Sequence, residues 1–299
     1  MLERRRLCAG GPLVTVLGFG ALEIGRNWGI GDAGARERPG SEAAAAVLHA
    51  VLDAGINLID TASAYHQSEA RIGQVLAGRR QEFVLASKCG EHNREPGTYY
   101  DFSYEAIRDS IDRSLELLRT DVIDLMQIHF GPDPEGVLDA GETVRAMRGA
   151  QEAGKVRYLG ASAPNRLAER CVRSGDFQVL QLEYNLLQRG VEPAIDRAAE
   201  QGVGVVLRGP LAGGWLTPRA RDGFGVKPEM RQRLQPYIDL VDGDLDRLPS
   251  LAMAFVRRNP GVCSILAGSK SLEHLRTNVA AFSAGLPPEL VAAAAAVRP

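Results

Sequence analysis

Short apolar runs alternate with longer amphipathic stretches along almost the whole chain. The short runs predict eight strands, at residues 14–17, 57–59, 83–87, 122–128, 158–161, 179–182, 203–207 and 264–266. The longer stretches predict helices at residues 41–54, 68–76, 104–118, 137–153, 165–174, 191–201, 248–259 and 272–282. Ile111, Leu115 and Leu118, for example, follow the spacing of three and four residues that marks one buried helical face.

Strands that alternate with helices pair in parallel through right-handed crossovers. Eight such units are what a closed barrel needs, so the pattern predicts an α/β protein with a (β/α)8 TIM barrel, a single domain over residues 1–299. An open doubly wound sheet would carry a GxGxxG turn after its first strand. Gly18, Gly20 and Gly25 do not have that spacing, and they are interpreted as loop glycines.

Two connections are longer than is usual between barrel elements. One covers residues 25–40 and follows the first predicted strand, and the other covers residues 208–247 and follows the seventh. Loops that follow barrel strands emerge at the C-terminal face, where barrel enzymes have their active sites. We therefore expect functional residues in both.

Charge and composition exclude several classes of partner. The formal net charge is −2 without a long run of one sign, so neither a nucleic acid nor an anionic membrane is an expected partner. No apolar stretch has the length of a membrane span or a signal peptide, which predicts a cytoplasmic protein. The 4 cysteines and 5 histidines lack metal-binding spacing, so we expect free thiols and no metal.

Ionisable residues follow three consecutive predicted strands. Asp60 comes directly after the second strand, Lys88 after the third and His129 after the fourth. Because the C-terminal ends of barrel strands surround one mouth, these side chains should converge there. Tyr65 lies in the loop beyond Asp60 and can reach the same space. Each residue alone has an ordinary structural explanation, such as a helix cap or an ion pair, but the combination favours chemistry.

The segments around these residues resemble the aldo-keto reductases. The sequence reads NLIDTASAY at 57–65, SK at 87–88 and QIH at 127–129, and the likeness continues in order through segments 160–162, 181–185, 209–214 and 268–278. The loop at 91–102 resembles that of bacterial sugar-dehydrogenase-like members. The resemblance covers essentially the whole chain.

The resemblance implies that Tyr65 is the general acid, supported by Asp60, Lys88 and His129. Hydride transfer to a carbonyl leaves an alkoxide that needs a proton, and a free tyrosine with a pKa near 10 supplies it slowly. We expect the Lys88 ammonium to lower the pKa of Tyr65 and Asp60 to keep Lys88 charged, while His129 orients the substrate oxygen.

The resemblance also implies a nicotinamide dinucleotide that lies extended across the barrel mouth. The matching positions are Ser162, Gln181, Arg208, Gly209, Leu211, Gly213, Gly268, Ser269, Lys270, His274 and Asn278. Ser162 and Gln181 match residues that hold the carboxamide, although Ala163 stands where the family often has asparagine. Arg208 replaces a tyrosine that stacks on the nicotinamide in many members.

Lys270 would meet a 2′-phosphate and so favours NADPH, with NAD as the alternative. His274 stands where relatives often carry arginine, which weakens this preference. Both residues could instead belong to an ordinary solvated helix start.

Three aromatic side chains could shape the substrate pocket. Trp28, Phe130 and Trp215 are expected to form an apolar wall, although each could equally be loop packing. The sequence thus predicts an NAD(P)H-dependent reductase of aldehydes and ketones, acting on a small carbonyl or sugar as a monomer or small homo-oligomer.

Three other functions remain open. The protein could oxidise an aldose or sugar alcohol, or it could be a cofactor-sensing regulatory subunit. An aldolase that uses Lys88 as a Schiff base is less favoured, because it leaves the segment at 268–278 unexplained.

Overall fold

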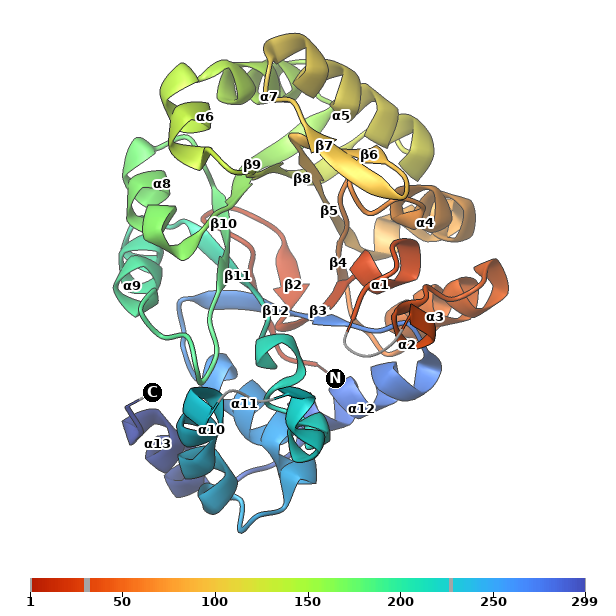
Figure 1. Ribbon diagram of the computed structural model, residues 1–299. Coiled ribbons are helices and arrows are strands. Elements are labelled where there is room, and N and C mark those ends of the chain that lie inside the picture. Colours follow the sequence, from red (N-terminus) through yellow and green to blue (C-terminus); the bar gives the residue numbers. More distant parts are fainter. Residues whose placement is uncertain (1, 30–32, 226–227, 299) are drawn as a thin grey trace.

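The computed structural model describes residues 2–29, 33–225 and 228–298, and eight of its strands close into a parallel barrel (Figure 1). In chain order these strands are β3 (Leu17–Gly20), β4 (Leu58–Asp60), β5 (Val84–Cys89), β8 (Ile123–His129), β9 (Val156–Ser162), β10 (Val179–Glu183), β11 (Gly204–Arg208) and β12 (Val262–Gly268). Each strand pairs in parallel with its neighbours, and β12 closes the ring against β3. The predicted (β/α)8 barrel is confirmed.

Helices surround this barrel. The outer helices are α3 (Ser41–Asp53), α4 (Ser68–Leu76), α5 (Tyr104–Leu118), α7 (Glu142–Glu152), α8 (Ala168–Ser174), α9 (Glu192–Glu200), α11 (Leu248–Arg257) and α12 (Leu272–Ser283). Additional helices are α1 (Leu22–Gly25), α2 (Ala33–Arg36), α6 (Pro134–Ala140), α10 (Pro228–Leu240) and α13 (Pro288–Ala296). Short 3-10 turns cover Ala77–Glu82, Asn165–Leu167, Ala212–Gly214, Pro218–Gly225 and Leu245–Arg247.

Local chemistry explains where these helices begin and end. The Ser103 hydroxyl caps α5 by accepting from the Ala106 amide at 3.4 Å, and the helix ends at Arg119 in a left-handed conformation. The single helix predicted at 137–153 is wrong, because the segment forms α6 and α7. Gly141 separates the two helices with φ +69°, a conformation that favours glycine.

The first predicted strand is also wrong in its register. Residues Leu13–Thr15 (β2) pair antiparallel with Arg4–Arg6 (β1), and the barrel strand β3 begins only at Leu17. Gly18 and Gly20 therefore lie in the barrel and not in a loop. A Cβ atom at Gly18 would come within 2.8 Å of the Ser264 hydroxyl oxygen, so the glycine allows β3 to approach β12 closely.

The long connections carry structure of their own. The predicted loop at 91–102 contains a hairpin of β6 (Glu91–Arg94) and β7 (Gly97–Tyr100). The connection after β3 contains α1 and α2, and the connection after β11 contains α10. All three segments follow the C-terminal ends of barrel strands, so they surround the barrel mouth.

Among the described residues, no single helix has the length and apolar composition to cross a membrane. Helices α12 and α13 together have that length and apolar composition, but a bend of 96° separates them.

Candidate active site

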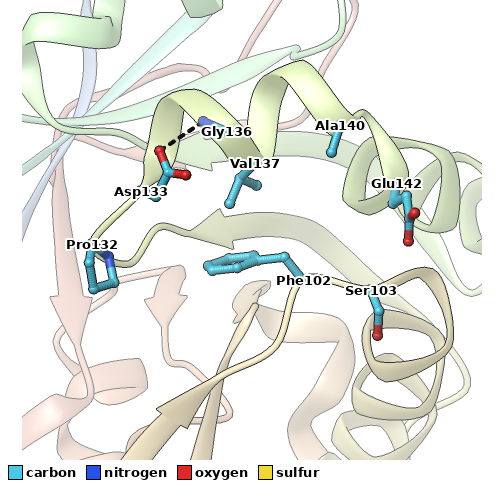
Figure 2. A pocket seen from close by; sticks show the side chains of 8 residues that line it. All are labelled: Phe102, Ser103, Pro132, Asp133, Gly136, Val137, Ala140 and Glu142. Atoms are coloured by element: carbon cyan, nitrogen blue, oxygen red, sulfur yellow. Dashed lines mark hydrogen bonds between the residues drawn. The ribbon is translucent and has the colours of Figure 1, made fainter.

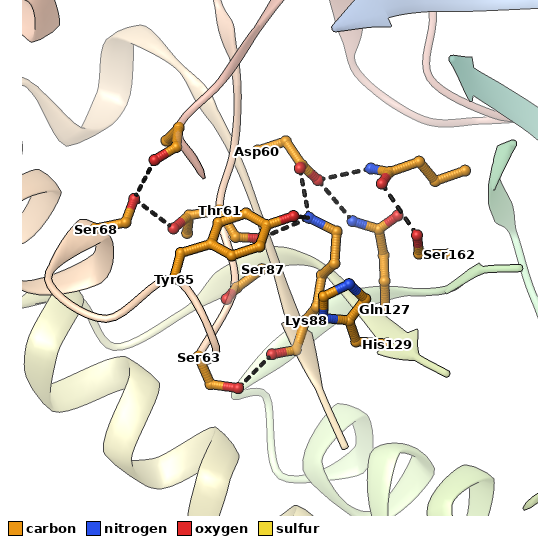
Figure 3. Close-up of polar contacts among 12 residues, drawn as sticks. Asp60, Thr61, Ser63, Tyr65, Ser68, Ser87, Lys88, Gln127, His129 and Ser162 are labelled. Carbon is orange, nitrogen blue, oxygen red and sulfur yellow. Dashed lines mark hydrogen bonds and ion pairs between the residues drawn. The ribbon is translucent and has the colours of Figure 1, made fainter. Parts of the chain in front are cut away.

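Four side chains meet at the C-terminal mouth of the barrel, as their positions after the strands predicted (Figure 3). The Lys88 ammonium on β5 lies 2.5 Å from the Asp60 carboxylate on β4 and 3.1 Å from the Tyr65 hydroxyl. The rings of Tyr65 and His129 meet edge to face, with their centroids 6.0 Å apart. The structure thus brings together all four residues that the sequence singled out.

Lys88 is completely buried, and each of its three protons has an acceptor. Besides Asp60 and Tyr65, the ammonium donates to the Thr61 carbonyl oxygen at 2.9 Å. Burial alone lowers the pKa of Lys88, but the neighbouring Asp60 carboxylate and Tyr65 outweigh it and raise the pKa above its ordinary value. Lys88 therefore stays charged.

Two glutamines hold the Asp60 carboxylate on its other side. Its Oδ1 atom accepts from Gln127 Nε2 at 2.9 Å and from Gln181 Nε2 at 2.8 Å. Sequence reasoning did not assign Gln127 to the site. The signal was present, since Gln127 stands two residues before His129 and alternate residues of a strand share a face. With both oxygens engaged, Asp60 has little freedom to turn away from Lys88.

The pKa of the Tyr65 hydroxyl differs from the expectation. Burial raises the pKa of Tyr65, and the Asp60 carboxylate adds to this, whereas Lys88 lowers it. The net direction is upward, so the predicted lowering by Lys88 is outweighed by burial. The phenol is therefore protonated at neutral pH, and Lys88 stabilises the phenolate as the proton leaves.

The turn that carries Tyr65 is anchored on both sides. The Ser63 hydroxyl donates to the carbonyl oxygens of Lys88 at 3.0 Å and Glu91 at 2.6 Å. The Thr61 hydroxyl donates to Ser68, whose hydroxyl donates to the Ala21 carbonyl oxygen, both at 2.8 Å. These bonds fix the turn to β5 and to the end of β3, which limits the movement of Tyr65.

Glu91 is a fifth member of the cluster. Its Oε2 atom lies 2.9 Å from His129 Nδ1, while Oε1 accepts from the Thr98 hydroxyl at 2.6 Å and lies 3.5 Å from Arg26. Burial raises the pKa of Glu91, but His129, Thr98 and Arg26 outweigh it and bring the pKa to about 2. Glu91 was not predicted as a site residue, because the hairpin that presents it was interpreted as a loop.

Opposing influences act on the pKa of His129, and the net direction is downward. Burial lowers its pKa below the ordinary value, as does Lys88, while the carboxylates of Glu91 and Asp60 raise it. A carboxylate beside Nδ1 favours the proton on that nitrogen. Nε2 of the neutral ring then carries a lone pair, which can accept from a substrate hydroxyl.

Comparisons with known proteins agree with this geometry. The model of the Aldo/keto reductase family matches residues 16–298. The chain belongs to the aldo/keto reductase family. The resemblance seen in the sequence is thereby confirmed, and the protein is an oxidoreductase of a family that uses nicotinamide cofactors.

Two curated relatives and one solved structure illustrate the similarity. L-galactose dehydrogenase of Arabidopsis thaliana is 28% identical, covering 94% of this chain and 88% of its own. NADH-specific methylglyoxal reductase of Escherichia coli is 28% identical, covering 78% and 80%. The holo form of the aldo-keto reductase AKR11C1 from Bacillus halodurans has 29% identity and a TM-score of 0.78, covering 99% and 96%.

In this aldo/keto reductase, the residues predicted for the nicotinamide end join the catalytic cluster. The Ser162 hydroxyl donates to Gln181 Oε1 at 3.1 Å, and Gln181 donates to Asp60. Arg208, another of the predicted cofactor-binding residues, forms an ion pair with Glu183 at 3.1 Å and is partly exposed. Beyond it, Leu211 is half-buried, and Gly209 and Gly213 are exposed with positive φ.

The residues predicted for the phosphate end lie where β12 leads into α12. The Ser271 hydroxyl caps α12 by accepting from the His274 amide at 3.2 Å. Asn278 organises the preceding loop through bonds to the Gly268 carbonyl oxygen and the Ser269 hydroxyl. Ser269 is completely buried, so its role in this loop is structural as well. Gly268 and the His274 side chain are exposed.

Lys270 has a partner that the sequence did not suggest. Its ammonium donates to the carbonyl oxygens of Ala35 and, at 3.3 Å, of Glu37. Lys270 therefore links the start of α12 to the connection after β3.

The donor set fits a dinucleotide. The capped N-terminus of α12 and the neighbouring Lys270 suit a phosphate. A Cβ atom at Gly213 would meet nothing within 4 Å, so there is open space beside this loop. At the other end, Ser162 and Gln181 retain hydrogen-bonding capacity for an amide.

Among the described residues, two pockets are lined by segments that follow the C-terminal ends of barrel strands. The first, of about 470 Å³, lies between the start of α5 and α6 and is lined by Phe102, Ser103, Pro132, Asp133, Gly136, Val137, Ala140 and Glu142 (Figure 2). The second, of about 350 Å³, includes Trp28 among several arginines. Trp28 therefore lies in a charged setting rather than the expected apolar one. Phe130 and Trp215 are half-buried against the core.

Proposed function

We propose that this protein reduces aldehydes or ketones to alcohols with NADPH, and that Tyr65 is the general acid. The observation that carries the proposal is the Tyr65 hydroxyl at 3.1 Å from the ammonium of a buried Lys88–Asp60 pair. Few arrangements make a phenol able to release a proton inside a protein, and an adjacent buried cation is one of them.

A nicotinamide cofactor, when bound, would supply the hydride for the carbonyl carbon. Tyr65 donates its proton to the carbonyl oxygen as negative charge develops there. Lys88 stabilises the phenolate that forms, and Asp60 keeps Lys88 in place. Proton transfer of this kind contributes about 10²–10⁴-fold to the rate. In the reverse direction, the Tyr65 phenolate accepts the proton of an alcohol.

Lys270 and the N-terminus of α12 would hold the phosphates, and Ser162 with Gln181 would hold the carboxamide. Lys270 supports a preference for NADPH through an ion pair with a 2′-phosphate. The name of the Escherichia coli relative states NADH specificity. NADH is therefore the alternative cofactor.

Oxidation of a sugar alcohol or aldose is the second candidate function. A neutral His129 whose Nδ1 proton faces Glu91 has a lone pair on Nε2, which accepts a hydrogen bond from a substrate hydroxyl. The Arabidopsis relative is named a dehydrogenase of L-galactose. These observations support small polyols and sugars as substrates beside simple carbonyls.

An absorbance assay of nicotinamide oxidation tests the proposal. For reduction, purified protein is incubated with NADPH or NADH and with aromatic aldehydes, ketones or aldoses. For oxidation, it is incubated with NADP⁺ or NAD⁺ and the matching alcohols. We expect turnover of at least one carbonyl and tighter binding of NADPH than of NADH. Tight cofactor binding without turnover in either direction would indicate a regulatory subunit instead.

Glu91→Gln should shift the pH dependence of carbonyl reduction. With one proton on Nδ1 facing Glu91, donation from Nε2 to a carbonyl oxygen requires the doubly protonated ring, and the Glu91 carboxylate raises the pKa of His129. Loss of this charge lowers that pKa further. We therefore expect the fall in kcat/KM with rising pH to occur at lower pH in this variant.

The measurement is kcat/KM for one aldehyde from about pH 5 to 8, the range in which histidine titrates. Glu95→Gln removes a carboxylate near the same hairpin that pairs with Arg38, so it controls for long-range charge. An unchanged profile in Glu91→Gln, or an equal shift in Glu95→Gln, would contradict the assigned role.

A further inference from the structure

The β6–β7 hairpin stands at the rim of the barrel mouth (Figure 1), and its two faces have different surroundings. Glu91 pairs directly with Tyr100, and the next pair along the hairpin is His92 with Tyr99. Directly paired residues of an antiparallel hairpin share a face, and successive residues alternate between the faces. Tyr100 therefore lies on the same face as Glu91. Tyr99 lies on the opposite face, where it stacks on His92.

The face that carries Glu91 is turned toward the catalytic cluster. Glu91 Oε2 lies 2.9 Å from His129 Nδ1, and the Thr98 hydroxyl on the same face donates to Glu91 at 2.6 Å. A Cβ atom at Gly131 would come within 2.7 Å of Tyr100 Cδ1, so the Tyr100 ring covers the chain two residues beyond His129. Tyr100 therefore lies beside the segment that carries the catalytic histidine, although it has no role in the reaction described so far.

The Tyr100 ring is held in place but is not covered. It lies nearly parallel to the Phe102 ring, at an interplanar angle of 16° and with 6.1 Å between the centroids. Phe102 in turn packs against Gly90, where a Cβ atom would come within 2.3 Å of Phe102 Cε1. Tyr100 is nevertheless 44% exposed. An exposed ring that its neighbours hold in place can stack with a third ring at little cost in conformational entropy.

The polar side chains beside this ring are already engaged. The Thr98 hydroxyl donates to Glu91 Oε1, which also lies 3.5 Å from Arg26. The other carboxylate oxygen of Glu91 faces His129. The wall next to His129 therefore presents mainly an aromatic surface. Such a surface suits an aryl group better than a polyol, because the hydroxyls of a polyol would lose hydrogen bonds to water.

We propose that Tyr100 is a specificity-determining residue on which the aromatic ring of the substrate stacks, so that the preferred carbonyl compounds are aryl aldehydes and ketones. The carbonyl oxygen of such a substrate meets Tyr65 and His129, and Tyr100 takes no part in proton transfer. The inference rests on the proposed reduction and names its substrate class. Stacking of a neutral aryl group does not require turnover, so the two claims can be tested separately.

The first arm compares benzaldehyde with cyclohexanecarbaldehyde, which has the same carbon skeleton without an aromatic face. We expect the preference for benzaldehyde, as a ratio of kcat/KM values, to fall about 2–10-fold in Tyr100→Ile, the effect of losing one aromatic contact. Isoleucine suits a strand as well as tyrosine does. Tyr100→Phe should keep the preference, because it keeps the ring and removes only the hydroxyl.

Two further variants separate the ring from the hairpin. Gly131→Ala displaces the Tyr100 ring without removing it, since the added Cβ atom would come within 2.7 Å of Cδ1, and the preference should fall in the same direction. Tyr99→Ile is the matched control, because Tyr99 is a 39% exposed ring on the opposite face of the same hairpin. Its loss should leave the preference unchanged.

The second arm measures binding without turnover. Saturation-transfer NMR follows the binding of benzamide and of cyclohexanecarboxamide, two neutral amides of matched skeleton, to the protein with excess NADP⁺ and without cofactor. We expect benzamide to bind about 2–10-fold more weakly to Tyr100→Ile than to the wild type, and cyclohexanecarboxamide to bind both equally.

The outcomes are distinct. Benzamide binding that depends on Tyr100, without turnover of any aldehyde, would support the role of Tyr100 and overturn the proposed reduction. Turnover with the same preference for benzaldehyde in Tyr100→Ile as in the wild type would overturn the role of Tyr100. An equal loss of preference in Tyr99→Ile would overturn it as well. So would a greater loss in Tyr100→Ile for an aldose such as D-xylose than for benzaldehyde, because the ring would then serve sugars.

Discussion

Replacing Tyr65 by phenylalanine is expected to lower kcat for carbonyl reduction about 10²–10⁴-fold while NADPH still binds. Phenylalanine keeps the aromatic ring and its edge-to-face contact with His129. It also keeps the ring face over which the Lys88 ammonium lies, 4.7 Å from the ring centroid. It removes only the hydroxyl that donates the proton. Steady-state kinetics give the loss of kcat, and quenching of protein fluorescence gives the affinity for NADPH.

Tyr99→Phe is the matched control for this substitution. Tyr99 lies on the neighbouring hairpin, is 39% exposed and stacks on His92 outside the cluster, so its hydroxyl should not matter. Retention of more than half of the wild-type kcat in Tyr65→Phe would show that another group supplies the proton.

Lys88→Met is expected to lower the free energy of unfolding by about 3–5 kcal/mol, the usual cost of removing one partner of a buried ion pair. Asp60 is only 3% exposed, so its negative charge would lose its main compensation in a site that water does not reach. Urea denaturation followed by circular dichroism measures the change. The double variant Asp60→Asn/Lys88→Met should recover much of the loss, because the amide is neutral and can still accept from Gln127.

An exposed ion pair provides the comparison. Lys155 also contacts a carboxylate at 2.5 Å, that of Asp112, but the two side chains are 39% and 45% exposed. Lys155→Met should cost less than about 1 kcal/mol, since water solvates the remaining charge. Equal losses in Lys88→Met and Lys155→Met would mean that the buried pair does not stabilise the fold in the way described.

The sequence predicted the barrel and its four converging side chains for a physical reason. Strands and helices of a barrel alternate strictly, and the residue after each strand is placed by the backbone alone. The positions of Asp60 and His129 could therefore be predicted without knowledge of side-chain packing. The same pattern could not show that β1 and β2 form a hairpin before the barrel, because residues 13–17 form one apolar run with a break inside it.

Interactions between distant side chains were beyond the sequence. Glu91, at the start of the β6–β7 hairpin, lies beside His129, and Lys270, which follows β12, reaches carbonyl oxygens in the connection after the neighbouring strand β3. The direction of the Tyr65 pKa was likewise a balance between burial and Lys88, and burial prevails. Such balances depend on the depth of each group, which spacing along the chain does not encode.

Transfer of deuterium from the cofactor tests the central claim most directly. The protein is incubated with an aldehyde and NADPH that carries two deuterium atoms at C4 of the nicotinamide, and the alcohol is examined by mass spectrometry and NMR. We predict one deuterium on the carbinol carbon of the product, and its formation should slow in Tyr65→Phe. An alcohol without deuterium, or no alcohol despite bound NADPH, would contradict hydride transfer at this site.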